Sequence, residues 1–198
     1  MKTQIAALVV SATLALTSAP AAAQTLVDGS DPELVRSLIS GFGSAVAETD
    51  SIGDPKIVGR IDGTRFHVYF YGCDDDHRNC RSVQFYAGWT GADVSVDVLN
   101  GWNRDNRFGK AYLTPDGAVA LEMDVNLDFG VSELNFDDTV DYWVIVLRNF
   151  RENVMAAAGG IDESEGPSAQ PAGVRASRPA SLEAWASVVP YLLARLAR

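Results

Sequence analysis

The chain has 198 residues, and its 26 acidic and 16 basic side chains give a formal net charge of −10 at pH 7. That length is enough for one domain with a hydrophobic core. The acidity excludes nucleic acid as a partner of the globular part, because an acidic surface repels phosphate groups. Residues 24–159 carry 22 acidic and 11 basic side chains, whereas residues 160–198 carry four of each, so the acidity belongs to the first region.

The first 23 residues have the pattern of a secretory signal peptide. Lys2 precedes an uncharged apolar stretch over residues 5–15, and residues 21–23 are all alanine. We expect cleavage after Ala23 and a periplasmic or secreted protein. The apolar stretch is too short to cross a bilayer as a mature helix, so no transmembrane segment is expected in the mature chain.

Residues 31–90 are expected to form one helix followed by four strands. Asp31 is suited to cap the helix and Pro32 to its first position. Apolar residues then recur at helical spacing: Val35, Leu38, Ile39 and Phe42. From Ser44 to Trp89 the apolar residues alternate with polar ones, and turn signals occur at residues 53–55 and 62–63. We predict strands near 44–50, 56–61, 64–72 and 81–89, paired as a meander.

Both cysteines of the chain lie in the stretch FYGCDDDHRNC at residues 70–80. If Cys73 stands opposite Cys80 in a hairpin, the numbers of any two opposite residues add to 153. One face then receives Phe70 with Val83, Val68 with Phe85 and Phe66 with Ala87, and the other receives Tyr71 with Ser82, Tyr69 with Gln84 and His67 with Tyr86. Because one face is wholly apolar and the protein is expected to be exported, this arrangement predicts a Cys73–Cys80 disulfide.

Two further helices and a hairpin are predicted after residue 90. The second helix has about ten residues by its apolar spacing, with Asp93 as its cap and one apolar face formed by Val94, Val98, Leu99 and Trp102. Residues 110–125 are typical of a hairpin around the turn at residues 115–117. Ser132 then begins a long helix whose apolar residues recur at steps of three and four: Phe136, Val140, Trp143, Val144, Leu147, Phe150 and Val154.

The C-terminal region separates into a linker and a helix. Residues 156–180 lack aromatic side chains and are rich in Gly, Pro, Ser and Ala, which predicts a disordered linker. Residues 181–198 are predicted to form an amphipathic helix with a kink at Pro190, and its apolar stripe consists of Leu182, Trp185, Val188 or Val189, Leu192 and Leu196. Such a stripe needs a surface that buries it, which is the chain's own domain, a partner protein or a membrane interface.

Four stretches of the chain resemble the YbjN-domain family of bacterial proteins, in particular its exported proteobacterial branch: HVYFYGC, NCRSVQFYAGW, NGWNRDNRFGKAYL and LEMDVNLDFGVS. The similarity extends from about Asp31 to Val154 and implies a YbjN-like α+β domain at residues 24–155. The resemblance implies a fold like that of secretion chaperones, a twisted antiparallel sheet flanked by helices. The implied order is helix, four strands, helix, two strands, helix. Domains of this kind bind protein segments, are often dimeric and are not known for chemistry.

No set of catalytic or metal-binding residues is predicted. A serine–histidine–aspartate triad would have to use His67 or His77, and no G-x-S-x-G motif, P-loop or dinucleotide fingerprint occurs in the sequence. We expect His67 as a packed surface residue opposite Tyr86 and His77 at the solvated tip of the cysteine hairpin. The acidic residues 74–76 are expected at a solvated hairpin tip, with a weak cation site as the alternative. Residues 124–128 imitate the start of a calcium loop, but its glycine and its final glutamate are misplaced, and we expect a strand there.

One further stretch is a candidate interaction patch. It comprises Trp102, Asn103, Arg104, Asp105, Arg107 and Phe108. The same stretch is equally suited to end the second helix. We therefore expect an exported protein that is not an enzyme, needs no cofactor or metal and binds an unidentified protein or peptide. Its oligomeric state stays open between a monomer and a homodimer. The alternative hypothesis is an acidic periplasmic protein that binds a small ligand or a cation.

Overall fold

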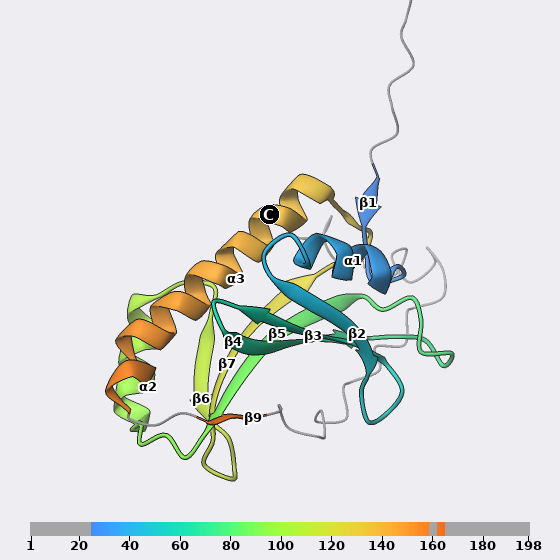
Figure 1. The fold of residues 1–198 in the computed structure, drawn as a ribbon. Coiled ribbons are helices and arrows are strands. Elements are labelled where there is room, and N and C mark those ends of the chain that lie inside the picture. The colour runs from blue at the N-terminus through green and yellow to red at the C-terminus, as the bar shows by residue number, and fades with distance from the viewer. Residues whose placement is uncertain (1–24, 159–161, 165–198) are drawn as a thin grey trace, which may run out of the picture.

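The structure is a computed structural model, which describes residues 25–158 and 162–164 (Figure 1). The predicted signal peptide (1–23), the predicted terminal helix (181–198) and most of the predicted linker (156–180) lie outside the described residues. Within the linker range, residues 162–164 form a short strand, β9 (Asp162–Ser164). The segments outside the described residues stay predictions from the sequence.

Three α-helices form where the apolar spacing predicts them. Helix α1 (Pro32–Ile39) is capped by Asp31, whose side chain accepts a hydrogen bond from the Leu34 amide at 2.9 Å. Helices α2 (Val96–Asp105) and α3 (Glu133–Asn153) are capped by Ser95 and Ser132. A 3-10 turn, η1 (Met155–Ala157), follows α3. All seven apolar positions predicted for the long helix are buried.

The main sheet is antiparallel, and six of its strands lie in the order β2-β3-β4-β5-β7-β6. The bounds are β2 Ser44–Thr49, β3 Pro55–Ile61, β4 Thr64–Tyr71, β5 Ser82–Thr90, β6 Lys110–Leu113 and β7 Val119–Asn126. Strand β9 pairs with the end of β5. Strands β1 (Leu26–Val27) and β8 (Val131–Ser132) form a separate pair. The predicted α+β class and element order are confirmed, and the three short strands are additions.

The hairpin of β4 and β5 has the predicted register. From His67 opposite Tyr86 to Tyr71 opposite Ser82, the numbers of opposite residues add to 153. The ladder ends one pair earlier than predicted, so Phe66 does not pair with Ala87. Beyond that point β9 pairs with β5, with Ser164 opposite Gly88. The apolar alternation therefore determined the register, and the length of the ladder depends on how the strands diverge.

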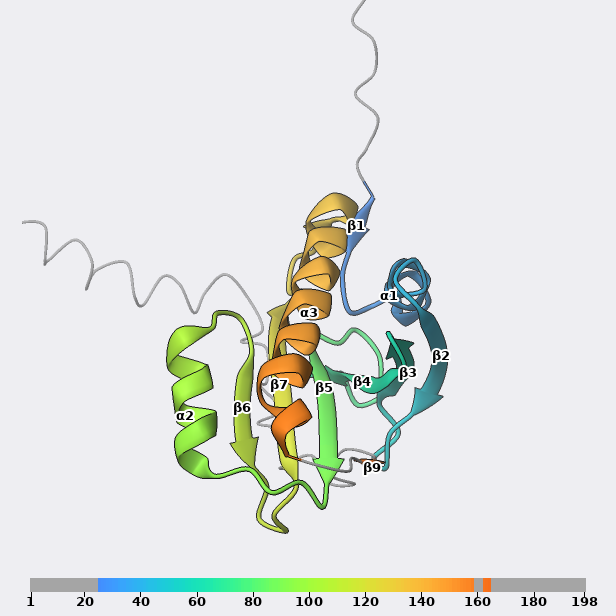
Figure 2. The same cartoon turned by 60° about the vertical axis from the view of Figure 1, so that its left-hand side comes forward.

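The described helices lie on one side of the sheet (Figures 1 and 2). Helix α3 crosses the middle strands, and its Trp143 ring lies 5.5 Å from that of Phe85 between centroids. Helix α2 joins the same core, because the Trp102 and Phe150 rings meet edge to face at 4.9 Å. One continuous cluster of buried side chains joins the three helices to this face of the sheet. We call it the helix face.

The start of α2 differs from the prediction. The cap is Ser95, which accepts a hydrogen bond from the Val98 amide, instead of Asp93. The reason is that Val94 packs into the core before the helix begins, with 9% of its surface exposed. The helix therefore buries Leu99 and Trp102, while Val98, predicted on the apolar face, is 48% exposed.

Candidate functional site

The second face of the sheet carries a separate aromatic cluster, and it is the candidate functional site. The cluster consists of Tyr69, Tyr86 and Ala120, with Tyr71 and Tyr112 packed against them. We call this surface the tyrosine face. Because alternate residues of a strand point to opposite sides, the residues between Phe66, Val68 and Phe70 of β4 face away from the helices. The part of the chain that the structure describes places no helix over this face (Figure 2).

Side chains on the tyrosine face are closely packed. The rings of His67 and Tyr69 stack at 5.7 Å between centroids, and Tyr69 meets Tyr86 edge to face at 6.2 Å. The exposed fractions of His67 and Tyr86 are only 1% and 2%. The sequence predicted His67 as a packed surface residue opposite Tyr86. The pairing is confirmed, but the surface position is wrong because the side chain is buried among aromatic rings.

Hydrogen bonds join the aromatic cluster to carboxylates on β7. The Tyr71 hydroxyl donates to Gln84 Oε1 at 3.0 Å, and Gln84 Nε2 donates to Asp124 Oδ1 at 2.8 Å. At the other edge, the Tyr112 hydroxyl donates to Glu122, whose second oxygen lies 2.7 Å from Lys110 Nζ. The carboxylates of Glu122 and Asp124, which lie on the same face of β7, are thus both engaged by neighbouring side chains.

Burial raises the pKa of the phenol groups of Tyr71, Tyr86 and Tyr112 well above the ordinary value, and the nearby carboxylates add to this effect. The hydrogen bond from Lys110 to Glu122 raises the pKa of the Lys110 ammonium group. These phenols therefore stay protonated, as hydrogen-bond donors, throughout the physiological pH range. The tyrosine face can supply apolar area and donor groups at once, a combination that protein interfaces favour.

Part of this site could be predicted from the sequence. Register analysis placed His67, Tyr69, Tyr71 and Tyr86 on the second face of the β4–β5 hairpin. It did not bring Tyr112 or the carboxylates of β7 to them, because the pairing of β5 with β7 joins segments about 40 residues apart, as the bonded pair Gln84 and Asp124 illustrates. The alternation of Tyr112, Ala120 and Glu122 was the only available signal for this contact.

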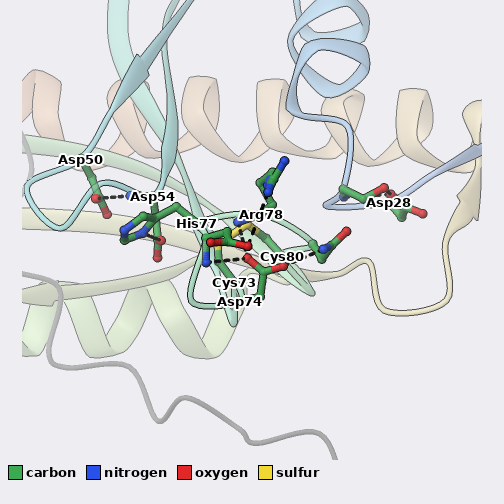
Figure 3. Close-up of a disulfide and its surroundings, with 11 residues drawn as sticks. Asp28, Asp50, Asp54, Cys73, Asp74, His77, Arg78 and Cys80 are labelled. Atoms are coloured by element: carbon green, nitrogen blue, oxygen red, sulfur yellow. Dashed lines mark hydrogen bonds and ion pairs between the residues drawn. A yellow bond between two sulfur atoms is a disulfide. The ribbon is translucent and has the colours of Figure 1, made fainter.

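The loop that joins β4 to β5 is closed by the Cys73–Cys80 disulfide (Figure 3). Residues 74–76 are exposed, as predicted. Asp74 holds the loop from within: its carboxylate accepts hydrogen bonds from the Arg78 amide at 2.8 Å and from Asn79 Nδ2 at 2.6 Å. These hydrogen bonds lower the pKa of Asp74, and the bond from the Arg78 amide has the largest effect.

His77 differs from its neighbours in this loop. Its Nδ1 lies 2.7 Å from Oδ1 of Asp54, a residue only 8% exposed in the turn just before β3 (Figure 3). The ring also approaches Gly53 so closely that a Cβ there would lie 3.1 Å from His77 Nε2. The sequence placed His77 with the solvated tip, and that expectation is wrong, because the side chain ties the disulfide loop to the neighbouring hairpin.

A cation site in this loop finds little support in the geometry. Across residues 25–158 and 162–164, the His, Cys, Asp and Glu side chains form no group of three that could hold a metal ion. Both oxygens of Asp74 accept hydrogen bonds from the loop itself. The described residues therefore offer no assembled cation site at residues 74–77.

The candidate patch at residues 102–108 divides into an internal and an exposed part. Trp102 Nε1 donates to Asn149 Oδ1 of α3 at 2.8 Å. Asn103 makes two hydrogen bonds with the backbone of Ala111, one as donor and one as acceptor, both 2.8 Å long. These two residues attach α2 to α3 and to the edge strand β6, so their contacts are structural.

The exposed part of the patch contains charges and one aromatic ring. Arg104 pairs with its neighbour Asp105. Phe108 is 48% exposed, and its ring lies 4.3 Å from that of Tyr142 of α3 between centroids, in a tilted arrangement. The Arg107 guanidinium lies 4.8 Å from the Phe108 ring centre. This exposed part of the patch stays a prediction of an interaction surface. It offers one pair of partly exposed rings and is therefore smaller than the tyrosine face.

A pocket of about 340 Å³ lies between the β3–β4 turn and the end of α3, lined by Asp62, Arg148, Arg151, Glu152 and Ala156. Arg148 forms an ion pair with the Asp62 carboxylate, and Arg151 Nη1 donates to the Asp62 carbonyl at 2.9 Å. The Arg148 bond lowers the pKa of Asp62. The charged side chains of the pocket thus stabilise the contact between the β3–β4 turn and α3.

The fold and the site define an α+β domain with helices over one sheet face and an aromatic cluster on the other. Residues 31–155 match the model of the YbjN family, described as "Putative bacterial sensory transduction regulator". The match covers more than half of the chain, so this chain belongs to the YbjN family. No curated protein matches the chain. None of the helices in the described part of the chain is long and apolar enough to span a membrane.

Proposed function

We propose that this chain is an exported, non-enzymatic YbjN domain that binds a protein or peptide partner through the tyrosine face, in a regulatory or chaperone-like role. The observation that carries the proposal is the tyrosine face itself, a patch of aromatic side chains on the side of the sheet opposite the described helices. Tyrosine supplies large contact area at low cost in conformational entropy, together with a hydrogen-bonding group.

Three further observations support this function. The family description is regulatory. The leader-like residues 1–23 and the Cys73–Cys80 disulfide both favour an oxidising, exported location. The phenols of Tyr71 and Tyr112 and the Glu122–Lys110 pair provide donors and charges at the rim of the apolar area, as interfaces with peptides require.

Site-specific photocrosslinking in cells tests this function. A benzophenone amino acid replaces Tyr112 on the tyrosine face or, as a matched control, Ile145, which is 59% exposed on α3. Crosslinks to another protein are expected from position 112 and not from position 145. Equal yields at both positions, or none at position 112, would contradict the proposal.

Purified proteins then measure the contribution of the face. The crosslinked partner segment is synthesised, and its affinity is compared for the full mature chain and for variants. Tyr112→Ala is expected to weaken binding about tenfold or more, as truncation of an interface hot spot does. Tyr142→Ala on α3 is the control and should leave the affinity unchanged.

A further inference from the structure

We propose that the C-terminal segment, residues 181–198, docks on the tyrosine face of its own chain. A consequence, which rests on the proposed function, is that this segment competes with the partner for the same surface. Three observations carry the docking: the place where the described chain leaves the sheet, the state of the tyrosine face, and the length and charge of the segment.

Strand β9 brings the C-terminal region to the edge of the tyrosine face. It pairs with Gly88, Trp89 and Thr90 of β5. Strand β7 occupies one edge of β5 as far as Trp89, so β9 lies on the other edge, where β4 pairs only with the residues from Ser82 to Tyr86. The strand runs antiparallel to β5 and therefore heads toward His67. Because β4 takes the next position, β9 cannot be extended along β5 beyond that point.

The helix face offers no room at this point. Trp89 points to the helix face, where it is 1% exposed and its ring lies 5.4 Å from that of Phe150. Met155, in the turn after α3, is also 1% exposed. The core is already filled on that side, so the open direction leads to the tyrosine face.

The tyrosine face has the character of a covered surface. Tyr86 is 2% exposed, Tyr69 8% and Ala120 0%, although the described helices all lie on the opposite face. Stable domains bury each apolar sheet face against another layer of structure. A second layer is therefore expected here, and the described residues supply none.

The segment 181–198 fits the dimensions of this layer. Its 18 residues would form a helix about 27 Å long, and β4 with its eight residues extends about 26 Å. The 16 residues from 165 to 180 can span at most about 53–58 Å, which exceeds the length of the face. The stripe of Leu182, Trp185, Val189, Leu192 and Leu196 provides the apolar side that such docking would bury.

Charge also favours docking within the chain. Residues 165–198 contain four arginines and two glutamates, a net charge of +2, whereas residues 24–159 have 11 basic and 22 acidic side chains, a net charge of −11. Asp124 is exposed at the rim of the tyrosine face. A weakly basic segment tethered to an acidic domain is attracted to it, and the tether supplies a high effective concentration.

Ring signals of 13C-labelled tyrosine in the full mature chain test the docking by NMR. The substitution Leu192→Glu places a charge in the apolar stripe, and Glu183→Gln is the matched control on the polar side of the same segment. Leu192→Glu should shift the signals of Tyr69, Tyr86 and Tyr112, which lie on the tyrosine face. Tyr142 on α3 should keep its signal, which shows that the domain remains folded.

Three results would overturn the docking. First, the signals of the tyrosine face could stay unchanged in Leu192→Glu. Second, the control Glu183→Gln could shift these signals as strongly as Leu192→Glu does. Third, the signal differences could vanish on dilution, which would identify a second copy of the chain as the occupant of the face. The competition has its own readout, which is the affinity of the synthetic partner segment for the purified full mature chain. If the segment is docked nine-tenths of the time, Leu192→Glu should increase the apparent affinity of the partner about tenfold.

The two proposals fail separately. Shifted tyrosine signals with no crosslinked partner would support docking and count against partner binding at this face. A crosslinked partner whose affinity does not change in Leu192→Glu would support partner binding and refute the competition.

Discussion

Removal of the Cys73–Cys80 disulfide should lower the free energy of unfolding of the mature chain without unfolding it. The bond joins residues with a sequence separation of 7. Closing a loop of about eight residues stabilises the native state by about 2.5 kcal/mol in the chain-entropy model. That is about a sixth to a half of the 5–15 kcal/mol that is typical of domains, so the chain without the bond should still fold, with a smaller margin.

Native contacts at both ends of the loop should keep the hairpin formed without the bond. Five residue pairs fix the register of β4 and β5. The Cys80 amide also donates to the Gly29 carbonyl at 3.2 Å, and His77 contacts Asp54. The oxidised bond therefore restricts the unfolded chain more than it shapes the native one.

Urea unfolding followed by tryptophan fluorescence measures the effect. The double variant Cys73→Ala/Cys80→Ala should lose about 2–3 kcal/mol, which corresponds to a midpoint lower by about 1–2 M for an ordinary urea slope. Each single variant should lose as much as the double variant, because either one breaks the bond. Single losses that add up to the double loss would show that side-chain packing, and not the crosslink, is responsible, and would refute this reasoning.

Three more predictions concern stability. Leu147→Ala in α3 should lower the free energy of unfolding by about 2–5 kcal/mol in the same urea assay, because Leu147 is 1% exposed, while Ile145→Ala at 59% exposure should change it by less than about 0.5 kcal/mol. Asn103→Ala should cost about 1–3 kcal/mol by leaving the Ala111 backbone without its two side-chain partners, and Arg104→Ala, which loses only an exposed pair, should cost less. Asp74 has a lowered pKa in the folded chain. Its contribution to the free energy of unfolding is therefore present above the pKa of the unfolded chain, near 4, and disappears as the pH falls through the pKa of the folded chain. Asp74→Asn should make the urea midpoint less sensitive to acid in this pH window, and an unchanged pH profile would contradict the assignment.

Local patterns predicted the helices and strands because they reflect local physics. The cap at Asp31 and the spacing of seven apolar residues in α3 depend on contacts within a few turns, and both are found as expected. The cap of α2 is the exception. Asp93 and Ser95 both suit the position, and the choice of Ser95 followed from the need to bury Val94, which is a tertiary contact.

The candidate site could be predicted only where one hairpin forms it. The alternation of β4 and β5 placed His67, Tyr69 and Tyr86 together, because the register of adjacent strands follows from which face is apolar. The position of β7 between β5 and β6 could not be derived in this way, since several pairings bury the same apolar residues. The contact of His77 with Asp54 joins two loops whose sequences carry no mutual signal.

By itself, then, the amino-acid sequence determined the three helices, the six longer strands, the β4–β5 register and the two cysteines that close it, because all of these follow from periodicity and short loops. Tertiary structure alone decided that Tyr112 and Glu122 join the tyrosines in one face, that His67 is buried there, and that β9 brings the C-terminal region to its edge. The physical reason is that contacts between distant segments depend on how whole layers pack, and no local pattern records that choice.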